Sequence, residues 1–262
     1  MRFLLYFCLL GMWNAAQAEE WPVMHGIPIE AGEAKELILS EVQVLRFSYH
    51  ANKVADARDY LSNSTQLSLG EIINQSFDTT LLRDTTLVGA PTESHLKTSF
   101  VIDNDEQATK RFLSGFISTD LSGALPIGSL VRYVSEYITE PTYIHGFHIA
   151  SKVAQTRSGD CTEYAVLTVS LARSLGLPAR FATGIALIQE GSQSVQAFGH
   201  AWAEIWQGEA WVIADAALHD LNNNQVFYLP ISELDNEGPG YSFSMLSAVG
   251  YFPQKISKLR GE

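Results

Sequence analysis

The feature that most constrains the fold is the segment 161–175, in which apolar side chains recur on nearly every side of a helix. A helix that is apolar all round belongs in the interior of a domain rather than at its surface. Gly176 suits the position that ends a helix, and Pro178 prevents the helix from continuing. The sequence therefore predicts a buried central helix that begins at Cys161, directly after the tight turn Ser158-Gly159-Asp160.

Three strands are predicted after this helix. Residues 180–188 form the first, and residues 201–206 and 211–216 form two more, joined by the short turn 207–210. The remaining C-terminal residues contain short apolar runs and are predicted to form edge strands and loops.

The predicted hairpin places one histidine beside one aspartate. If the turn pairs Trp206 with Trp211, the register continues so that Trp202 lies opposite Asp215. His200 and Asp215 then share one face of the hairpin as diagonal neighbours, whose Cβ atoms lie about 7–8 Å apart or somewhat less. A register shift of one residue would put them on opposite faces. The spacing therefore predicts a hydrogen bond between the imidazole and the carboxylate.

Cys161, His200 and Asp215 together supply the parts of a thiol catalytic triad. A thiol attacks carbonyl carbons as the thiolate, and the positive end of a helix lowers a thiol pKa. The acidic neighbours Asp160 and Glu163 act weakly in the opposite direction, so a histidine is needed as base and ion-pair partner. Asp215 would fix the tautomer of the His200 ring and leave its other nitrogen for the thiol. The alternative for Cys161 is a buried, inert structural thiol.

The first 18 residues predict a signal peptide. Arg2 precedes an apolar run that extends to Trp13, and Ala16-Gln17-Ala18 fits a small-residue cleavage site. The mature chain would start near Glu19 and keep Cys161 as its one cysteine, in the periplasm or outside the cell. An uncleaved anchor is the alternative, but the apolar run is shorter than the roughly 20 residues that a membrane span needs. No later stretch is apolar enough to span a bilayer, so stable membrane insertion after cleavage is not expected.

Charge and residue spacing exclude two further classes of partner. The formal net charge is −12, and the sequence contains no cluster of lysine and arginine. Nucleic acids bind to clustered basic side chains, so no nucleic-acid partner is expected. The other histidines, including His145, His148 and His219, show no spacing typical of metal ligands. We predict no metal site and no cofactor.

Residues 19–118 give weaker signals than the rest of the chain. Segments 41–49, 76–88 and 96–102 favour strands, and segment 107–116 favours a helix. We predict a small β-rich N-terminal region over residues 19–118 and a catalytic domain over residues 119–262. The joint between them is marked by turn-forming residues, Gly123, Pro126 and Gly128.

Several blocks of the catalytic domain resemble the core of the transglutaminase-like superfamily. They are Gly159-Asp160-Cys161, residues 171–180, residues 199–204 and Trp211 with Asp215, in this order within roughly residues 125–217. The resemblance implies a papain-like α+β fold, in which the helix that carries the cysteine packs on an antiparallel sheet. It also implies acyl transfer from an amide, with Cys161 as nucleophile, His200 as base and Asp215 as orienting acid. The family commonly has a proline after this aspartate, where the chain has Ala216-Ala217.

Two further residues lie on the same face of the hairpin as His200. Trp202 is predicted either to line a groove for the acyl donor or to pack in the core, and the sequence leaves both open. Trp206 and Trp211 are predicted to pack in the core. Glu204 is predicted to be an ion-pair partner rather than a catalytic group.

The predicted function is that of an exported transglutaminase-like thiol enzyme. Its substrates would be amide bonds of peptides or proteins, and the outcome would be either cross-linking or hydrolysis. One alternative is a cysteine protease or amidase that acts on cell-wall peptides. Another is a catalytically silent peptide-binding module of the same fold.

Overall fold

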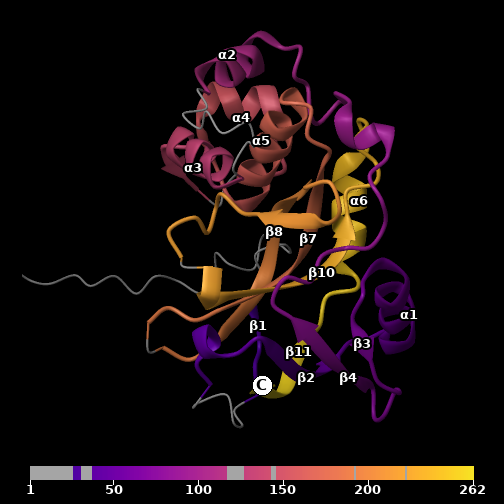
Figure 1. The fold of residues 1–262 in the computed structure, drawn as a ribbon. Helices are drawn as coiled ribbons and strands as arrows, with labels where there is room; N and C mark the ends of the chain where they lie inside the picture. Colours follow the sequence, from indigo (N-terminus) through magenta and orange to yellow (C-terminus); the bar gives the residue numbers. More distant parts are fainter. Residues whose placement is uncertain (1–25, 31–36, 117–126, 143–145, 192, 222) are drawn as a thin grey trace, which may run out of the picture.

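The computed structural model describes residues 26–30, 37–116, 127–142, 146–191, 193–221 and 223–262. These residues form a mixed α+β fold with a five-stranded sheet, a four-stranded sheet and a group of helices (Figure 1). The helices are α1 Val54–Ser64, α2 Gln107–Gly115, α3 Ile127–Tyr137, α4 Ala150–Thr156, α5 Cys161–Ser174 and α6 Tyr241–Val249. The predicted α+β architecture is therefore confirmed.

Both sheets are antiparallel throughout their described ladders. The larger sheet has the order β1-β8-β7-β10, and β9 pairs with the outer edge of β8. Its strands are β1 Gly26–Ile27, β7 Ala179–Ile188, β8 Gln196–Trp206, β9 Trp211–Ala214 and β10 Val226–Glu233. The smaller sheet has the order β11-β2-β4-β3, with β2 Val44–His50, β3 Ser68–Leu69, β4 Ser76–Leu82 and β11 Lys255–Gly261. A parallel pair of two-residue strands, β5 Glu140–Pro141 and β6 Ser158–Gly159, lies beside α5.

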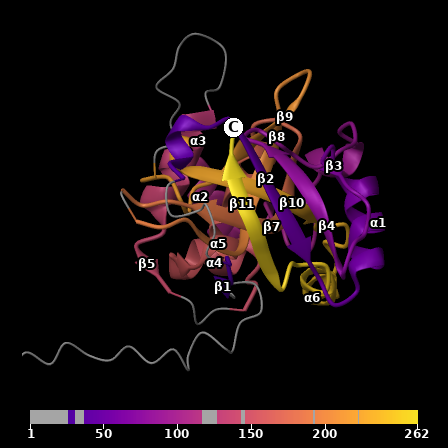
Figure 2. The same cartoon turned by 90° about the horizontal axis from the view of Figure 1, so that it is seen from below.

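One face of the larger sheet is shared by helix α5 and the smaller sheet. Phe181 on β7 belongs to the same apolar core as Cys161 and the rest of α5, whereas Ile185 and Leu187, further along β7, belong to the core of the smaller sheet. Because side chains alternate across a strand, these odd-numbered residues of β7 point to one side. Figure 1 shows helices α2–α5 toward one end of the larger sheet and the smaller sheet, with α1, toward the other. Figure 2, the view from below, has β11, β2 and β4 of the smaller sheet in the foreground.

The smaller sheet joins the two ends of the described chain. Strand β11 pairs with β2, and Lys255 lies opposite His50. Residues 19–118 contain strands β2, β3 and β4 but also helices α1 and α2, and the β-rich N-terminal region stays a prediction. The predicted boundary at residues 118–119 lies outside the described residues and stays a prediction. The strands do not divide there, because β11 from the C-terminal part completes the N-terminal sheet.

Two local predictions for the less informative segments are wrong. Residues 96–102 do not form a strand, because the short 3-10 helix Glu93–Leu96 is followed by a loop without a ladder. The segment 241–249, expected to be strand or loop, forms helix α6. The predicted helix at residues 107–116 is confirmed as α2.

Helix α5 begins with a reciprocal cap that the sequence order Asp-x-x-Glu encodes. Asp160 Oδ1 accepts the N–H of Thr162 at 2.9 Å, and Glu163 Oε2 accepts the N–H of Asp160 at 3.0 Å. A Cβ at Gly159 would lie 2.3 Å from Cβ of Glu163, so only glycine leaves room for the folded-back glutamate. This cap fixes the residue between the two acids, Cys161, at the first position of the helix.

The face of the larger sheet that points away from α5 is kept open by small residues on its middle strand. Ala182, Gly184 and Ala186 of β7 lie on this face, beside Trp202 on β8 and Tyr228 on β10. A Cβ at Gly184 would lie 2.1 Å from the backbone oxygen of Leu229 and 2.8 Å from Cη2 of Trp202. The large rings from the outer strands can therefore meet above the middle strand.

The predicted signal peptide, residues 1–18, lies outside the described residues. Among the helices that the structure describes, none has both the length and the apolar character needed to cross a membrane.

Candidate active site

His200 and Asp215 meet as the hairpin register predicts. Strands β8 and β9 pair Trp206 with Trp211, and the ladder continues to Ala203 opposite Ala214, one residue before Asp215. The chain then leaves the ladder, and His200 Nε2 lies 2.7 Å from Asp215 Oδ2. The histidine side chain is 2% exposed and that of the aspartate 5%. The predicted imidazole–carboxylate hydrogen bond is therefore present in the structure, away from bulk solvent.

The carboxylate of Asp215 is held by four donors. Its Oδ1 accepts the backbone N–H groups of Ala217 at 2.9 Å and Leu218 at 3.2 Å. Its Oδ2 accepts His200 Nε2 and the hydroxyl of Tyr228, the latter at 2.8 Å. The tight turn after Asp215 thus supplies, through backbone amides, a constraint at the position where the family commonly has proline.

Asp215 is poised to remain ionised in its buried position. Burial by itself raises the pKa of this carboxyl, but the positive charge of His200 and the hydrogen bonds from His200, Tyr228 and Leu218 outweigh it. The result is a pKa below the ordinary value for aspartate. A charged Asp215 is the form that stabilises a protonated imidazole.

Cys161 contacts strand β8 at a part of its outer edge where no other described strand pairs with it. On that edge β1 pairs with residues 197–198 and β9 with residues 203–206, which leaves residues 199–202 without a strand partner among the described residues. The backbone N–H of Ala201, inside this gap, hydrogen-bonds the sulfur of Cys161. Helix α5 thus brings its first residue to the strand position adjacent to His200, and the thiol is 4% exposed.

The second ring nitrogen of His200 is not engaged by Asp215. With Nε2 directed at Asp215, the buried Nδ1 makes no hydrogen bond to any residue that the structure describes. Hydrogen bonds between catalytic groups are often long without substrate and tighten in the reactive complex. The structure therefore places Cys161, His200 and Asp215 in one buried region, with the His–Asp contact formed.

The resting thiol is more weakly acidic than the helix start alone predicts. Burial raises the pKa of Cys161 well above its ordinary value, the charges of Asp160, Asp215 and Glu163 raise it further, and the N–H of Ala201 opposes them. The helix start alone therefore does not make this thiol acidic, and a histidine is needed as its base, as expected from the sequence. Burial and the nearby carboxylates disfavour the thiolate, so the Cys161 thiol keeps its proton before substrate binds.

The two cap carboxyls add a titratable group beside the nucleophile. The Thr162 hydroxyl lies 2.9 Å from Asp160 Oδ1 and 3.0 Å from Glu163 Oε2, so the two carboxyls share its one proton, and the backbone N–H of His148 donates to Glu163 Oε1 at 2.8 Å. Burial and the neighbouring Glu163 raise the pKa of Asp160 to about 7. Near neutral pH, the charge beside Cys161 therefore changes with pH.

Asp160→Asn is expected to make Cys161 more reactive only above about pH 7. Asparagine keeps an oxygen for the N–H of Thr162, so the cap remains. Below about pH 7 Asp160 is mostly protonated, so variant and wild type should react alike. Above it the wild type carries an extra negative charge that disfavours the thiolate. Alkylation of Cys161 by iodoacetamide, followed by mass spectrometry across pH, measures this. The control is Asp78→Asn, which is remote from Cys161 and should give the same alkylation rates as wild type at every pH. If the rates of Asp160→Asn also equal those of wild type at every pH, the prediction is contradicted.

Trp202 is packed beneath the histidine rather than at a surface. Its ring is fully buried, lies nearly parallel to the His200 ring with centroids 6.2 Å apart, and packs against Tyr228 at 5.1 Å. The core-packing alternative for Trp202 is what the structure describes. Its predicted role in substrate binding stays a prediction, since the ring has no exposed surface here.

Glu204 forms a buried ion pair. Arg180 Nη2 lies 2.7 Å from Glu204 Oε2, and both side chains are at most 3% exposed. Glu204 Oε1 also accepts the indole N–H of Trp202 at 3.4 Å, which is a long contact. The prediction that Glu204 is an ion-pair partner is confirmed, and the pair supports the tryptophan under His200.

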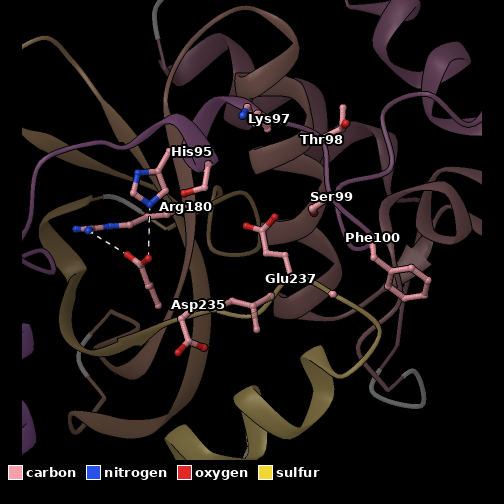
Figure 3. Close-up of a pocket in the computed structure, with 12 residues that line it drawn as sticks. His95, Lys97, Thr98, Ser99, Phe100, Arg180, Asp235 and Glu237 are labelled. Carbon is pink, nitrogen blue, oxygen red and sulfur yellow. Dashed lines mark hydrogen bonds and ion pairs between the residues drawn. The ribbon is translucent and has the colours of Figure 1, made fainter.

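A pocket of about 310 Å³ is lined by Arg180 of this ion pair, together with His95 and Glu237 (Figure 3). Glu233, which also lines the pocket, forms ion pairs with Arg180 at 3.3 Å and with His95 at 3.5 Å. Neither Cys161 nor His200 lines it. Among the described residues no group of three histidine, cysteine or acidic side chains is arranged to hold a metal ion. The absence of a metal or cofactor stays a prediction.

A thiol at the start of a buried helix, beside a histidine–aspartate pair on an antiparallel sheet, defines a papain-like α+β protein. The family model of the transglutaminase-like superfamily matches residues 110–216, which include Cys161, His200 and Asp215. Over these residues the chain is similar to the transglutaminase-like superfamily.

Solved structures of three proteins show a partial likeness. A candidate cysteine protease from Cytophaga hutchinsonii is 15% identical, with a TM-score of 0.42 over 73% of this chain and 76% of that chain. A protein described as a TGase is 15% identical, with a TM-score of 0.35 over 66% of this chain and 51% of that chain. Red sea bream transglutaminase is 11% identical, with a TM-score of 0.35 over 69% and 46%. The comparison with curated proteins gives no match.

Proposed function

We propose that the chain is an exported thiol enzyme that transfers the acyl group of a peptide or protein amide to water or to another amine. The observation that carries the proposal is the His200–Asp215 hydrogen bond at 2.7 Å, which leaves His200 Nδ1 without a hydrogen bond to any described residue, while the buried Cys161 accepts the N–H of Ala201, the residue next to His200. Export rests on the signal peptide predicted for residues 1–18.

The first half of the reaction forms a thioester. The proton of the Cys161 thiol moves to His200 Nδ1, while the Nε2–H of the ring keeps its bond to Asp215 Oδ2. The sulfur attacks the amide carbonyl carbon, and the tetrahedral intermediate collapses as the C–N bond breaks. His200 returns its proton to the leaving nitrogen, which departs as ammonia or an amine. Asp215 stays ionised throughout and stabilises the imidazolium.

The second half releases the acyl group. Water or an amine loses a proton to His200 Nδ1 as it attacks the thioester, and the thiol of Cys161 is regenerated. Burial of the thiol and the imidazole favours proton transfer between them over transfer to solvent. Access of water relative to an amine then decides between hydrolysis and cross-linking.

Alkylation of Cys161 is expected to depend on His200. Because burial disfavours the thiolate, rapid reaction with iodoacetamide near neutral pH requires a base that accepts the thiol proton. His200→Ala should slow alkylation at least about 100-fold, the low end of what a positioned base contributes. His50→Ala, which removes an imidazole from the smaller sheet, is the matched control and should leave the rate unchanged. Equal rates in wild type and His200→Ala would favour a silent binding module.

Turnover assays separate the two outcomes of the reaction. Ammonia released from glutamine-containing peptides, measured with and without an added amine, reports acyl transfer when the amine is incorporated. Release without incorporation reports hydrolysis, as expected of an amidase. Absence of both, together with rapid His200-dependent alkylation, would assign the reactive thiol to a different amide substrate.

A further inference from the structure

The hydroxyl of Tyr228 shares one oxygen of Asp215 with the histidine. His200 Nε2 and Tyr228 Oη lie 2.7 Å and 2.8 Å from the same atom, Asp215 Oδ2. The other oxygen of the carboxylate is occupied by two backbone amides. Both donors on Oδ2 are side chains from different strands, so the position of this oxygen depends on the packing of the whole sheet.

The sheet is built so that this tyrosine can reach the aspartate. Tyr228 lies on β10, and β7 separates that strand from β8, which carries His200. Residues of β7 on this face are Ala182, Gly184 and Ala186, which leave space above the strand. The Tyr228 ring crosses this space and packs against Trp202, 5.1 Å away, with the His200 ring at 6.3 Å.

The tyrosine can only act as a donor at this site. Burial and the adjacent Asp215 charge raise the pKa of Tyr228 well above its ordinary value, so the phenol keeps its proton at neutral pH. A phenol has one proton to donate, and the carboxylate has none while it is ionised. The hydrogen bond therefore runs from Tyr228 to Asp215 and withdraws electron density from the oxygen that also binds His200.

We propose that Tyr228 is a positioning residue that holds Asp215 Oδ2 against His200 and limits how strongly the carboxylate attracts the imidazole proton. The inference rests on the proposed function, since it assigns to Tyr228 an effect on the base of that reaction. Tyr228 acts through Asp215 and has no part in binding the substrate. Nothing in the sequence pattern of β10 distinguishes this tyrosine from a core residue.

Tyr228→Phe tests the proposal in two independent ways. With its second side-chain donor gone, Asp215 Oδ2 interacts more strongly with a protonated His200. The acidic limb of the pH profile of kcat/KM should therefore move to higher pH. At the optimum kcat/KM should fall about 10- to 100-fold, the range for losing a hydrogen bond to a charged group, with KM unchanged. The low-field proton resonance of His200 Nε2–H should move further downfield, because its acceptor is stronger.

The control is a second tyrosine, Tyr60 on α1, whose hydroxyl donates to another residue of β10. Tyr60 donates its hydroxyl to Ser232 of β10 at 2.7 Å, so Tyr60→Phe removes a comparable bond without touching Asp215. It should change neither the acidic limb nor the resonance. If Tyr228→Phe leaves both the acidic limb of the pH profile and the His200 proton resonance unchanged from wild type, the proposal is overturned. If wild type shows no turnover, the proposed function fails alone, and the resonance by itself decides the role of Tyr228.

Discussion

Replacing Cys161 by alanine is expected to lower kcat/KM by about 10⁴-fold or more, on the scale seen when a triad loses an essential member. Cys161 is the one cysteine outside the predicted signal peptide, so no second thiol is present to replace it. The fold should persist, since alanine fits the apolar environment that already includes Ala165 and Ala201. Ammonia release from an amide substrate, measured beside the thermal unfolding midpoint, separates loss of chemistry from loss of structure.

The double variant Cys161→Ala with His200→Ala tests whether the two residues act in the same reaction step. Groups that act as a unit are not additive, so the double variant should be no slower than Cys161→Ala alone. Losses that multiply would mean that His200 serves a different reaction step from Cys161. Activity that survives Cys161→Ala at the wild-type level would place the chemistry elsewhere in the chain.

Arg180→Met is expected to lower the free energy of unfolding by about 3–5 kcal/mol, the usual cost of breaking a buried ion pair. Glu204 is fully buried and Arg180 is 3% exposed, so the substitution leaves a carboxyl without its charged partner. Arg180 also donates to the backbone oxygens of Leu87 and Val88, which would lose these hydrogen bonds. Urea denaturation followed by tryptophan fluorescence measures the change.

Two further variants show whether the loss of stability in Arg180→Met arises from burial of the unpaired Glu204 charge. Arg180→Met combined with Glu204→Leu removes both charges and should recover part of the loss, because no uncompensated charge remains buried. Arg46 pairs with Glu262 at 2.7 Å where both side chains are exposed, so Arg46→Met should change the stability little. An equal effect of Arg180→Met and Arg46→Met would refute the buried-pair explanation.

Structure could be predicted from the sequence wherever the local pattern of apolar residues and turns determines strand register or helix position. The register from Trp206–Trp211 follows from a short turn and alternation, and it places His200 beside Asp215. The apolar helix from Cys161, ended by Gly176 in the left-handed conformation, follows from composition and from one backbone requirement. From the sequence, Asp160 and Glu163 are interpreted only as acidic neighbours of Cys161, although their Asp-x-x-Glu spacing is typical of the helix cap that they form.

Features that depend on distant parts of the chain could not be predicted in this way. Tyr228 on β10 reaches Asp215 only because small residues on β7 leave space between β10 and β8. This contact depends on the strand order β8-β7-β10, which the sequence alone does not reveal. The raised pKa of Cys161 reflects burial by several elements rather than its place on one helix. Segment 241–249 begins with Tyr-Ser-Phe-Ser, an alternation typical of strands, yet it folds as α6.

The pairing of β11 with β2 has a consequence for how the molecule reaches this fold. His50 lies opposite Lys255, about 200 residues further along the chain, so closing this ladder carries a large entropic cost. Contacts between such distant residues slow folding. While the chain emerges N-terminus first, β2 and β4 can form a hairpin-like pair early, but the edge of β2 stays unprotected until the last strand arrives. We therefore expect the larger sheet and α5 to assemble first and the smaller sheet to close last.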